Sequence, residues 1–196
     1  MSKDYDTLKY INEEMGDVDE KIKSVVCKMF NRLHERKCYA SCLSTSAVLY
    51  LSFKYLGLNP KIILGKLLVQ GFGFQHVWIE LDERIYDLAI HFDTKHHPVF
   101  IENEFKEEPP VVNKKYESTN AKYLKWTFDD TWVMTNLYKM LGKTLEEYMD
   151  EAPVDDLFRD TCYVLDISET KENLDKLRNL SKEIKISDKE NEYDYG

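Results

Sequence analysis

Three side chains able to perform thiol chemistry occur in the order Cys42, His76, Asp87. A cysteine attacks a carbonyl carbon as its thiolate, so it needs a neighbouring group that takes its proton. A histidine can take and return that proton, and a carboxylate can orient the imidazole ring and stabilise its charged form. The three residues therefore predict acyl transfer to, or hydrolysis of, an amide or peptide, with Cys42 as nucleophile, His76 as base and Asp87 as the orienting group.

The nucleophile is expected at the start of a helix over about residues 41 to 56. Apolar residues recur there on one wide face, and Gly57 followed by Asn59-Pro60 supplies a stop signal. The unpaired backbone N–H groups of the first helical turn would stabilise a negative sulfur and would offer one arm of an oxyanion hole.

His76 and Asp87 are expected on adjacent strands of a hairpin, because the sequence alternates like β-strand on both sides of Asp82-Glu83. A two-residue turn there pairs residues whose numbers sum to 165. His76, Trp78 and Asp87 then share one face of the sheet, with Asp87 diagonal to His76. A three-residue turn would shift the register by one and separate the three residues.

The remaining pattern predicts an α+β chain in three parts. These are a catalytic domain over 1–128, a helical C-terminal extension packed on the core over 129–186, and a disordered acidic tail over 187–196. Within them we expect an amphipathic helix over 19–36, a strand over 61–70, a turn at the GFGF segment of 71–74, a long surface loop over 91–120, and helices over 129–142 and 171–185.

Several segments resemble one enzyme superfamily. CLSTSAVLYLSFKYLGLNP, which begins at Cys42, resembles the nucleophile helix of transglutaminase-like cysteine enzymes. HVWIEL resembles their histidine strand, commonly HAWVE, and Tyr86-Asp87 resembles their closing aspartate. The short gap between His76 and Asp87 is similar to that of compact bacterial members, including the leader peptidases of lasso-peptide maturation.

The resemblance implies a papain-like α+β fold, in which the nucleophile helix packs on an antiparallel sheet, and cysteine protease or acyltransferase activity. Two departures concern the oxyanion hole. Ala40-Ser41 replaces the Gly or Gln that commonly precedes the cysteine of the family, and no upstream Gln matches the papain-type oxyanion donor. The second arm of the oxyanion hole is therefore unassigned.

Other interpretations of the same residues stay open. Cys38 is a rival nucleophile, or a packing neighbour or redox partner of Cys42. Trp78 could form core or a pocket wall, and Glu80 a solvent-exposed edge or a specificity group; both are substrate-binding candidates. The whole chain could instead be a non-catalytic papain-like scaffold that binds a peptide or protein. A metal hydrolase would need ligands from the cluster His91, Asp93, His96 and His97, which lacks regular ligand spacing.

Composition limits the partners. The 196 residues carry a net charge of -9, and residues 145 to 196, with 16 acidic and 7 basic side chains, account for all of it. The absence of a basic cluster argues against a nucleic-acid partner. No long apolar run or secretory signal is seen, so we expect no membrane association and a cytoplasmic location. We expect free thiols, no metal and no cofactor, and a peptide, protein or small amide substrate; the oligomeric state is unknown.

Overall fold

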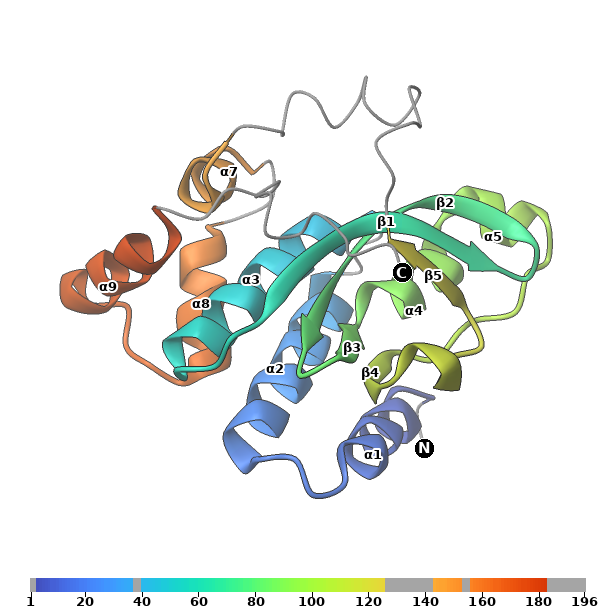
Figure 1. The fold of residues 1–196 in the computed structure, drawn as a ribbon, viewed down its shortest axis with the longest axis horizontal. Coiled ribbons are helices and arrows are strands. Elements are labelled where there is room, and N and C mark those ends of the chain that lie inside the picture. The colour runs from blue at the N-terminus through green and yellow to red at the C-terminus, as the bar shows by residue number, and fades with distance from the viewer. Residues whose placement is uncertain (1–2, 37–39, 126–142, 153–155, 183–196) are drawn as a thin grey trace.

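The computed structural model describes residues 3–36, 40–125, 143–152 and 156–182. It is an α+β structure in which helices cover a five-stranded antiparallel sheet (Figure 1). None of the described helices is long and apolar enough to cross a membrane. The helices are α1 (Lys3–Met15), α2 (Glu20–Arg36), α3 (Cys42–Tyr55), α4 (Ala89–His96), α5 (Pro98–Glu102), α7 (Leu145–Glu151), α8 (Leu157–Leu165) and α9 (Lys171–Ser181), with a short 3-10 helix at Tyr116–Ser118.

The sheet has the strand order β4-β3-β2-β1-β5. Its first four strands are neighbours in chain order, and the last strand returns to pair with β1, which makes β5 an edge formed by a long-range contact. The strands are β1 (Lys61–Val69), β2 (Phe72–Leu81), β3 (Arg84–Asp87), β4 (Val111–Lys114) and β5 (Lys122–Lys125).

Two tight turns set the register of the sheet. At the turn between β2 and β3, Asp82 and Glu83 both have positive φ, 49° and 61°, as a two-residue hairpin turn requires. Leu81 pairs with Arg84, so the predicted pairing of residues whose numbers sum to 165 is confirmed. The predicted GFGF turn is wrong. Gln70 and Gly71 make the turn between β1 and β2 with φ of 50° and 87°, and β2 already begins at Phe72.

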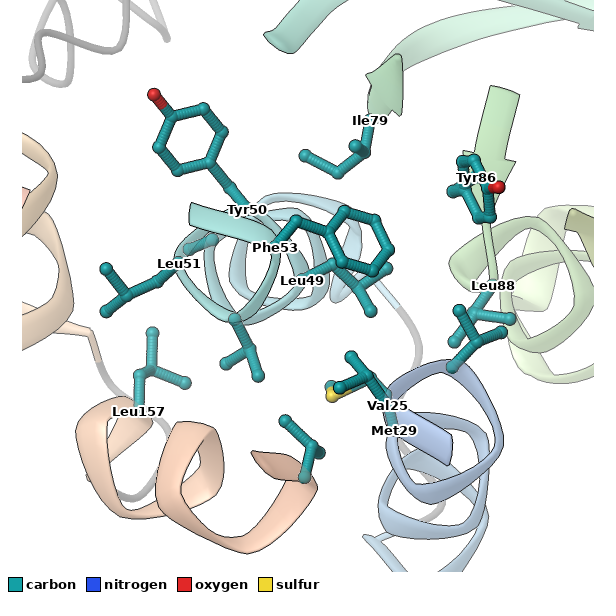
Figure 2. Packing of buried hydrophobic residues seen from close by; sticks show 14 of the residues in the cluster. Val25, Met29, Leu49, Tyr50, Leu51, Phe53, Ile79, Tyr86, Leu88 and Leu157 are labelled. Atoms are coloured by element: carbon teal, nitrogen blue, oxygen red, sulfur yellow. The ribbon is translucent and has the colours of Figure 1, made fainter. Parts of the chain in front are cut away.

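Helix α3 lies against one face of β1 and β2. Its apolar side chains join Val77 and Ile79 in the larger of two hydrophobic clusters, and the Ser46 hydroxyl donates a hydrogen bond to the Val77 carbonyl oxygen at 3.2 Å. Figure 2 shows this packing, with Ile79 above the helix and α2 and α8 below it. The opposite face of the sheet carries a second cluster, which includes Trp78 and Tyr123.

The C-terminal helices α8 and α9 contact α3, and α8 also contacts α2. Residues from α7, α8 and α9 belong to the same cluster as α3. The C-terminal helices therefore pack on the same hydrophobic core as α3, the helix that begins at the candidate nucleophile. The division of the chain at residue 128 stays a prediction.

The expectation of a long surface loop over 91–120 is wrong, because that range contains most of α4, all of α5 and β4, and the 3-10 helix. Pro98 occupies the first turn of α5, where a backbone N–H would have no partner within the helix. The His97 side chain caps this helix by accepting a hydrogen bond from the Val99 N–H at 3.3 Å.

Three predicted helices correspond to observed ones: 19–36 to α2, 41–56 to α3, and 171–185 to α9, which ends at Ser181. The predicted helix at 129–142 and the predicted disordered tail at 187–196 lie outside the described residues.

Candidate active site

Cys42 is the first residue of α3, and its thiol is free and half-buried. The chain reaches it through Ala40, whose φ of 54° lies in the left-handed region. The Ala40 N–H donates a hydrogen bond to Asp93 Oδ1 at 2.7 Å. A contact from α4 therefore fixes the backbone just before the thiol, and the first-turn N–H groups of α3 lie beside it.

His76 and Asp87 form a buried pair, each 2% exposed. The imidazole Nε2 lies 2.7 Å from Asp87 Oδ2. The same oxygen accepts a hydrogen bond from the Tyr123 hydroxyl at 2.8 Å, and Asp87 Oδ1 accepts one from the Ile90 N–H at 3.2 Å. His76, Tyr123 and the Ile90 N–H thus converge on this one carboxyl group.

The second ring nitrogen of His76 is left for the thiol. Nδ1 is buried and has no nitrogen or oxygen hydrogen-bond partner. Burial by itself would lower the pKa of His76, but the charge and hydrogen bond of Asp87 raise it well above its ordinary value. The Cys42 thiol raises this pKa further by hydrogen bonding and charge, so Cys42 lies within interaction range of the ring. The raised pKa therefore favours a protonated imidazole next to the Cys42 sulfur.

Asp93 is a second carboxylate at this site. It is 4% exposed, and its Oδ2 lies 3.6 Å from His76 Nδ1. Burial raises the pKa of Asp93, while the charge of His76 and the Ala40 N–H act to lower it. Sequence reasoning placed this residue only in the alternative metal cluster. The signal for its true position is its spacing, since Asp93 falls six residues after Asp87, on the helix that directly follows β3.

The residues of the alternative metal cluster have other contacts. His91 Nδ1 lies 2.9 Å from the Glu108 carbonyl oxygen, and Asp93 binds Ala40. Among the residues the structure describes, no three His, Cys, Asp or Glu side chains are placed to hold one metal ion.

Trp78 and Glu80 lie inside the molecule. Trp78 is fully buried, and its indole N–H donates to the Tyr116 hydroxyl at 3.0 Å. Glu80 is 7% exposed, accepts a hydrogen bond from Tyr116 at 2.7 Å and forms an ion pair with Lys125 at 2.8 Å. The expected solvent-exposed edge at Glu80 is therefore wrong, and this burial disfavours a substrate-binding role for either residue.

Two tyrosines at the site were missed by sequence reasoning. Tyr123 comes from β5, and burial together with Asp87 raises its pKa well above the ordinary value, so the phenol stays a neutral donor. Tyr148 comes from α7, where burial first and the charge of Cys42 second raise its pKa. Helix α7 thus borders the thiol. The rival nucleophile Cys38 lies outside the described residues.

Comparison with known proteins adds no relative. The chain matches no protein-family model, no curated protein and no solved structure. Its chemistry must therefore be argued from the geometry of Cys42, His76 and Asp87.

Proposed function

We propose that this protein is a thiol-dependent enzyme that transfers an acyl group from, or hydrolyses, an amide or peptide. The observation that carries the proposal is the buried 2.7 Å contact between His76 Nε2 and Asp87 Oδ2, which leaves Nδ1 unpartnered beside a cysteine at a helix start. The α3 helix packed on an antiparallel sheet supports the finer proposal of a papain-like, transglutaminase-like fold.

The proposed chemistry begins with proton transfer from the Cys42 thiol to His76 Nδ1, which gives a thiolate next to an imidazolium. The sulfur attacks the carbonyl carbon, and the C=O electrons move to oxygen. When they return, the C–N bond breaks and the amine leaves with the proton from His76. Water or an amine then attacks the thioester and releases Cys42. Asp87 orients the ring and stabilises its charge throughout.

Alkylation with iodoacetamide at pH 6 tests the proposal without knowledge of the substrate. An ordinary thiol with a pKa near 8.5 is only about 0.3% thiolate at that pH, whereas an ion-paired thiol is largely thiolate. Because a thiolate of lower basicity is also a weaker nucleophile, the net gain is about 10-fold or more. Rates at each cysteine are read by mass spectrometry of a proteolytic digest.

Cys27 is the reference thiol, since it is also half-buried and its pKa is raised by burial and by Glu20. We expect Cys42 to react at least about 10-fold faster than Cys27, and His76→Ala to remove the difference. His34→Ala, which replaces an exposed histidine on α2, is the matched control.

Equal rates at Cys42 and Cys27 in the wild-type protein would reject the enzyme and favour a non-catalytic scaffold that binds a peptide or protein. A fast reaction at Cys38 in place of Cys42 would transfer the nucleophile role to Cys38. The same digest reports all of these rates.

A further inference from the structure

Four buried side-chain nitrogen or oxygen atoms of the described residues lack a nitrogen or oxygen hydrogen-bond partner; two belong to residues at the start of α3 and two to neighbouring residues of β2. They are Ser41 Oγ, Thr45 Oγ1, Gln75 Nε2 and His76 Nδ1. Ser41 and Thr45 lie one residue before and three after Cys42, and Gln75 precedes His76. His76 Nδ1 faces the Cys42 thiol. Buried polar atoms are almost always paired in folded proteins, so the unpaired amide nitrogen of Gln75 is available to bind another polar group.

The packing of α3 on β2 brings Gln75 level with Cys42. Ser46 contacts Val77, and further along the helix Phe53 packs on Tyr86, the pairing partner of Ile79, so the two elements run in the same direction. One helical turn back from Ser46, about 6 Å, is Cys42. Two strand residues back from Val77, about 7 Å, is Gln75, which by strand alternation faces α3.

We propose that Gln75 Nε2 is the second donor of the oxyanion hole, opposite the backbone N–H of Cys42. This inference rests on the proposed function, because an oxyanion arises only if Cys42 attacks a carbonyl. As the Sγ–C bond forms, the C=O electrons move to oxygen, and the two N–H groups stabilise the negative charge until the electrons return and the leaving group departs. Without substrate, Gln75 Nε2 has no hydrogen-bond partner among the described residues. When substrate binds, its carbonyl oxygen becomes that partner.

The two hydroxyls among these four atoms are poorer donors for this purpose. Ser41 is the N-cap residue of α3 and Thr45 lies in its first turn, so both hydroxyls come from the element that already supplies the Cys42 N–H. Gln75 comes from the strand that carries His76. It can therefore approach the carbonyl oxygen from outside α3, while the N–H of Cys42 approaches from within it.

A comparison of acylation with alkylation of the Cys42 sulfur distinguishes an oxyanion-hole role of Gln75 from a purely structural role. The probe is p-nitrophenyl acetate: Cys42 attacks its carbonyl carbon, an oxyanion forms, and p-nitrophenolate leaves and is followed by its absorbance. Alkylation by iodoacetamide displaces iodide at a saturated carbon and forms no oxyanion. Gln75→Met, which keeps the shape but removes the donor, should slow acylation by about 100-fold and change alkylation at pH 6 by less than about 3-fold.

Comparison variants make the result decisive. Gln75→Glu, which places a carboxylate oxygen at the donor position, should slow acylation at least as much. Ser41→Ala and Thr45→Val should change acylation by less than about 3-fold, since a weakly held hydroxyl contributes little. Loss of acylation in either of these two variants, with normal acylation in Gln75→Met, would overturn the assignment.

Each of the remaining outcomes overturns either this inference or the proposed function. Acylation of Gln75→Met within about 3-fold of wild type overturns the inference and leaves the proposed function intact. If neither Gln75 variant separates the two reactions, Gln75 acts on folding alone and the inference is wrong. A wild-type Cys42 that reacts with neither reagent faster than Cys27 overturns the proposed function, and the oxyanion site with it.

Discussion

Replacement of Asp87 by Asn tests whether one carboxylate sets the direction of proton transfer. The two side chains have the same shape, but Asn has one acceptor oxygen and one NH2 donor. In the native site both carboxylate oxygens accept hydrogen bonds, Oδ2 from His76 and Tyr123 and Oδ1 from the Ile90 N–H. If the oxygen of the replacement amide serves Ile90, its NH2 group faces His76 Nε2, which must then become an acceptor.

The neutral imidazole then carries its proton on Nδ1, the nitrogen that faces the thiol, and cannot accept the proton of Cys42. The corresponding change in a serine protease lowers kcat about 10⁴-fold. For a cysteine, which is more easily ionised, we expect acylation by p-nitrophenyl acetate to fall by about 100-fold or more. Alkylation of Cys42 at pH 6 should fall by about 10-fold, to the rate of Cys27.

Unfolding in urea gives a second measurement of the same replacement. Asp87 raises the pKa of His76 above its unfolded value, so the stabilisation is fully present below about pH 6.5 and is lost as the pH rises through the folded pKa. Loss of a hydrogen bond to a charged group costs about 1.5–3 kcal/mol. The free energies of unfolding of wild type and D87N should therefore differ by about that amount near pH 6 and converge at higher pH.

Asp82→Asn is the control, because it makes the same chemical change at an exposed turn of the same hairpin. It should leave alkylation, acylation and stability unchanged. A folded D87N protein whose Cys42 still alkylates at the wild-type rate at pH 6 would refute the role given to Asp87.

Two further replacements test the supports of the site. Tyr123→Phe removes one donor to Asp87 and should lower the free energy of unfolding by about 1.5–3 kcal/mol in urea, since the bond is to a charged group; an unchanged midpoint would contradict the 2.8 Å contact. Gly65→Ala should cost about 1–3 kcal/mol, because the new Cβ would meet the Leu124 carbonyl oxygen and lie 2.5 Å from the Trp78 ring; normal thermal stability would show that β1 and β5 can separate there.

The hairpin that carries His76 and Asp87 could be predicted from the sequence because local information specifies it. Two strands of alternating pattern flank the two residues Asp82-Glu83, and an even turn length fixes which side chains share a face. The other turn was misplaced because its first residue with positive φ is Gln70, a residue type that gives little turn signal, and two glycines nearby offered competing positions.

The missed residues reach the site through contacts that local pattern does not encode. Tyr123, 36 positions after Asp87, meets it only because β5 returns to pair with β1. Asp93 is placed by α4, whose N-cap residue Leu88 makes no side-chain capping bond, so no capping motif announces the helix. The candidate nucleophile and base were visible as residue types, whereas their supports depend on tertiary packing.

The Asp93 carboxylate contacts both the backbone that leads to the nucleophile and the imidazole of the base. One oxygen holds the backbone of Ala40, 53 positions earlier in the chain, and the other lies 3.6 Å from the imidazole. The backbone before the thiol and the imidazole base thus both contact one side chain of α4, so the complete site requires the contact between Ala40 and Asp93. Full reactivity at Cys42 should accordingly appear during refolding only after this long-range contact has formed, so the alkylation rate of the thiol reports on a completed site.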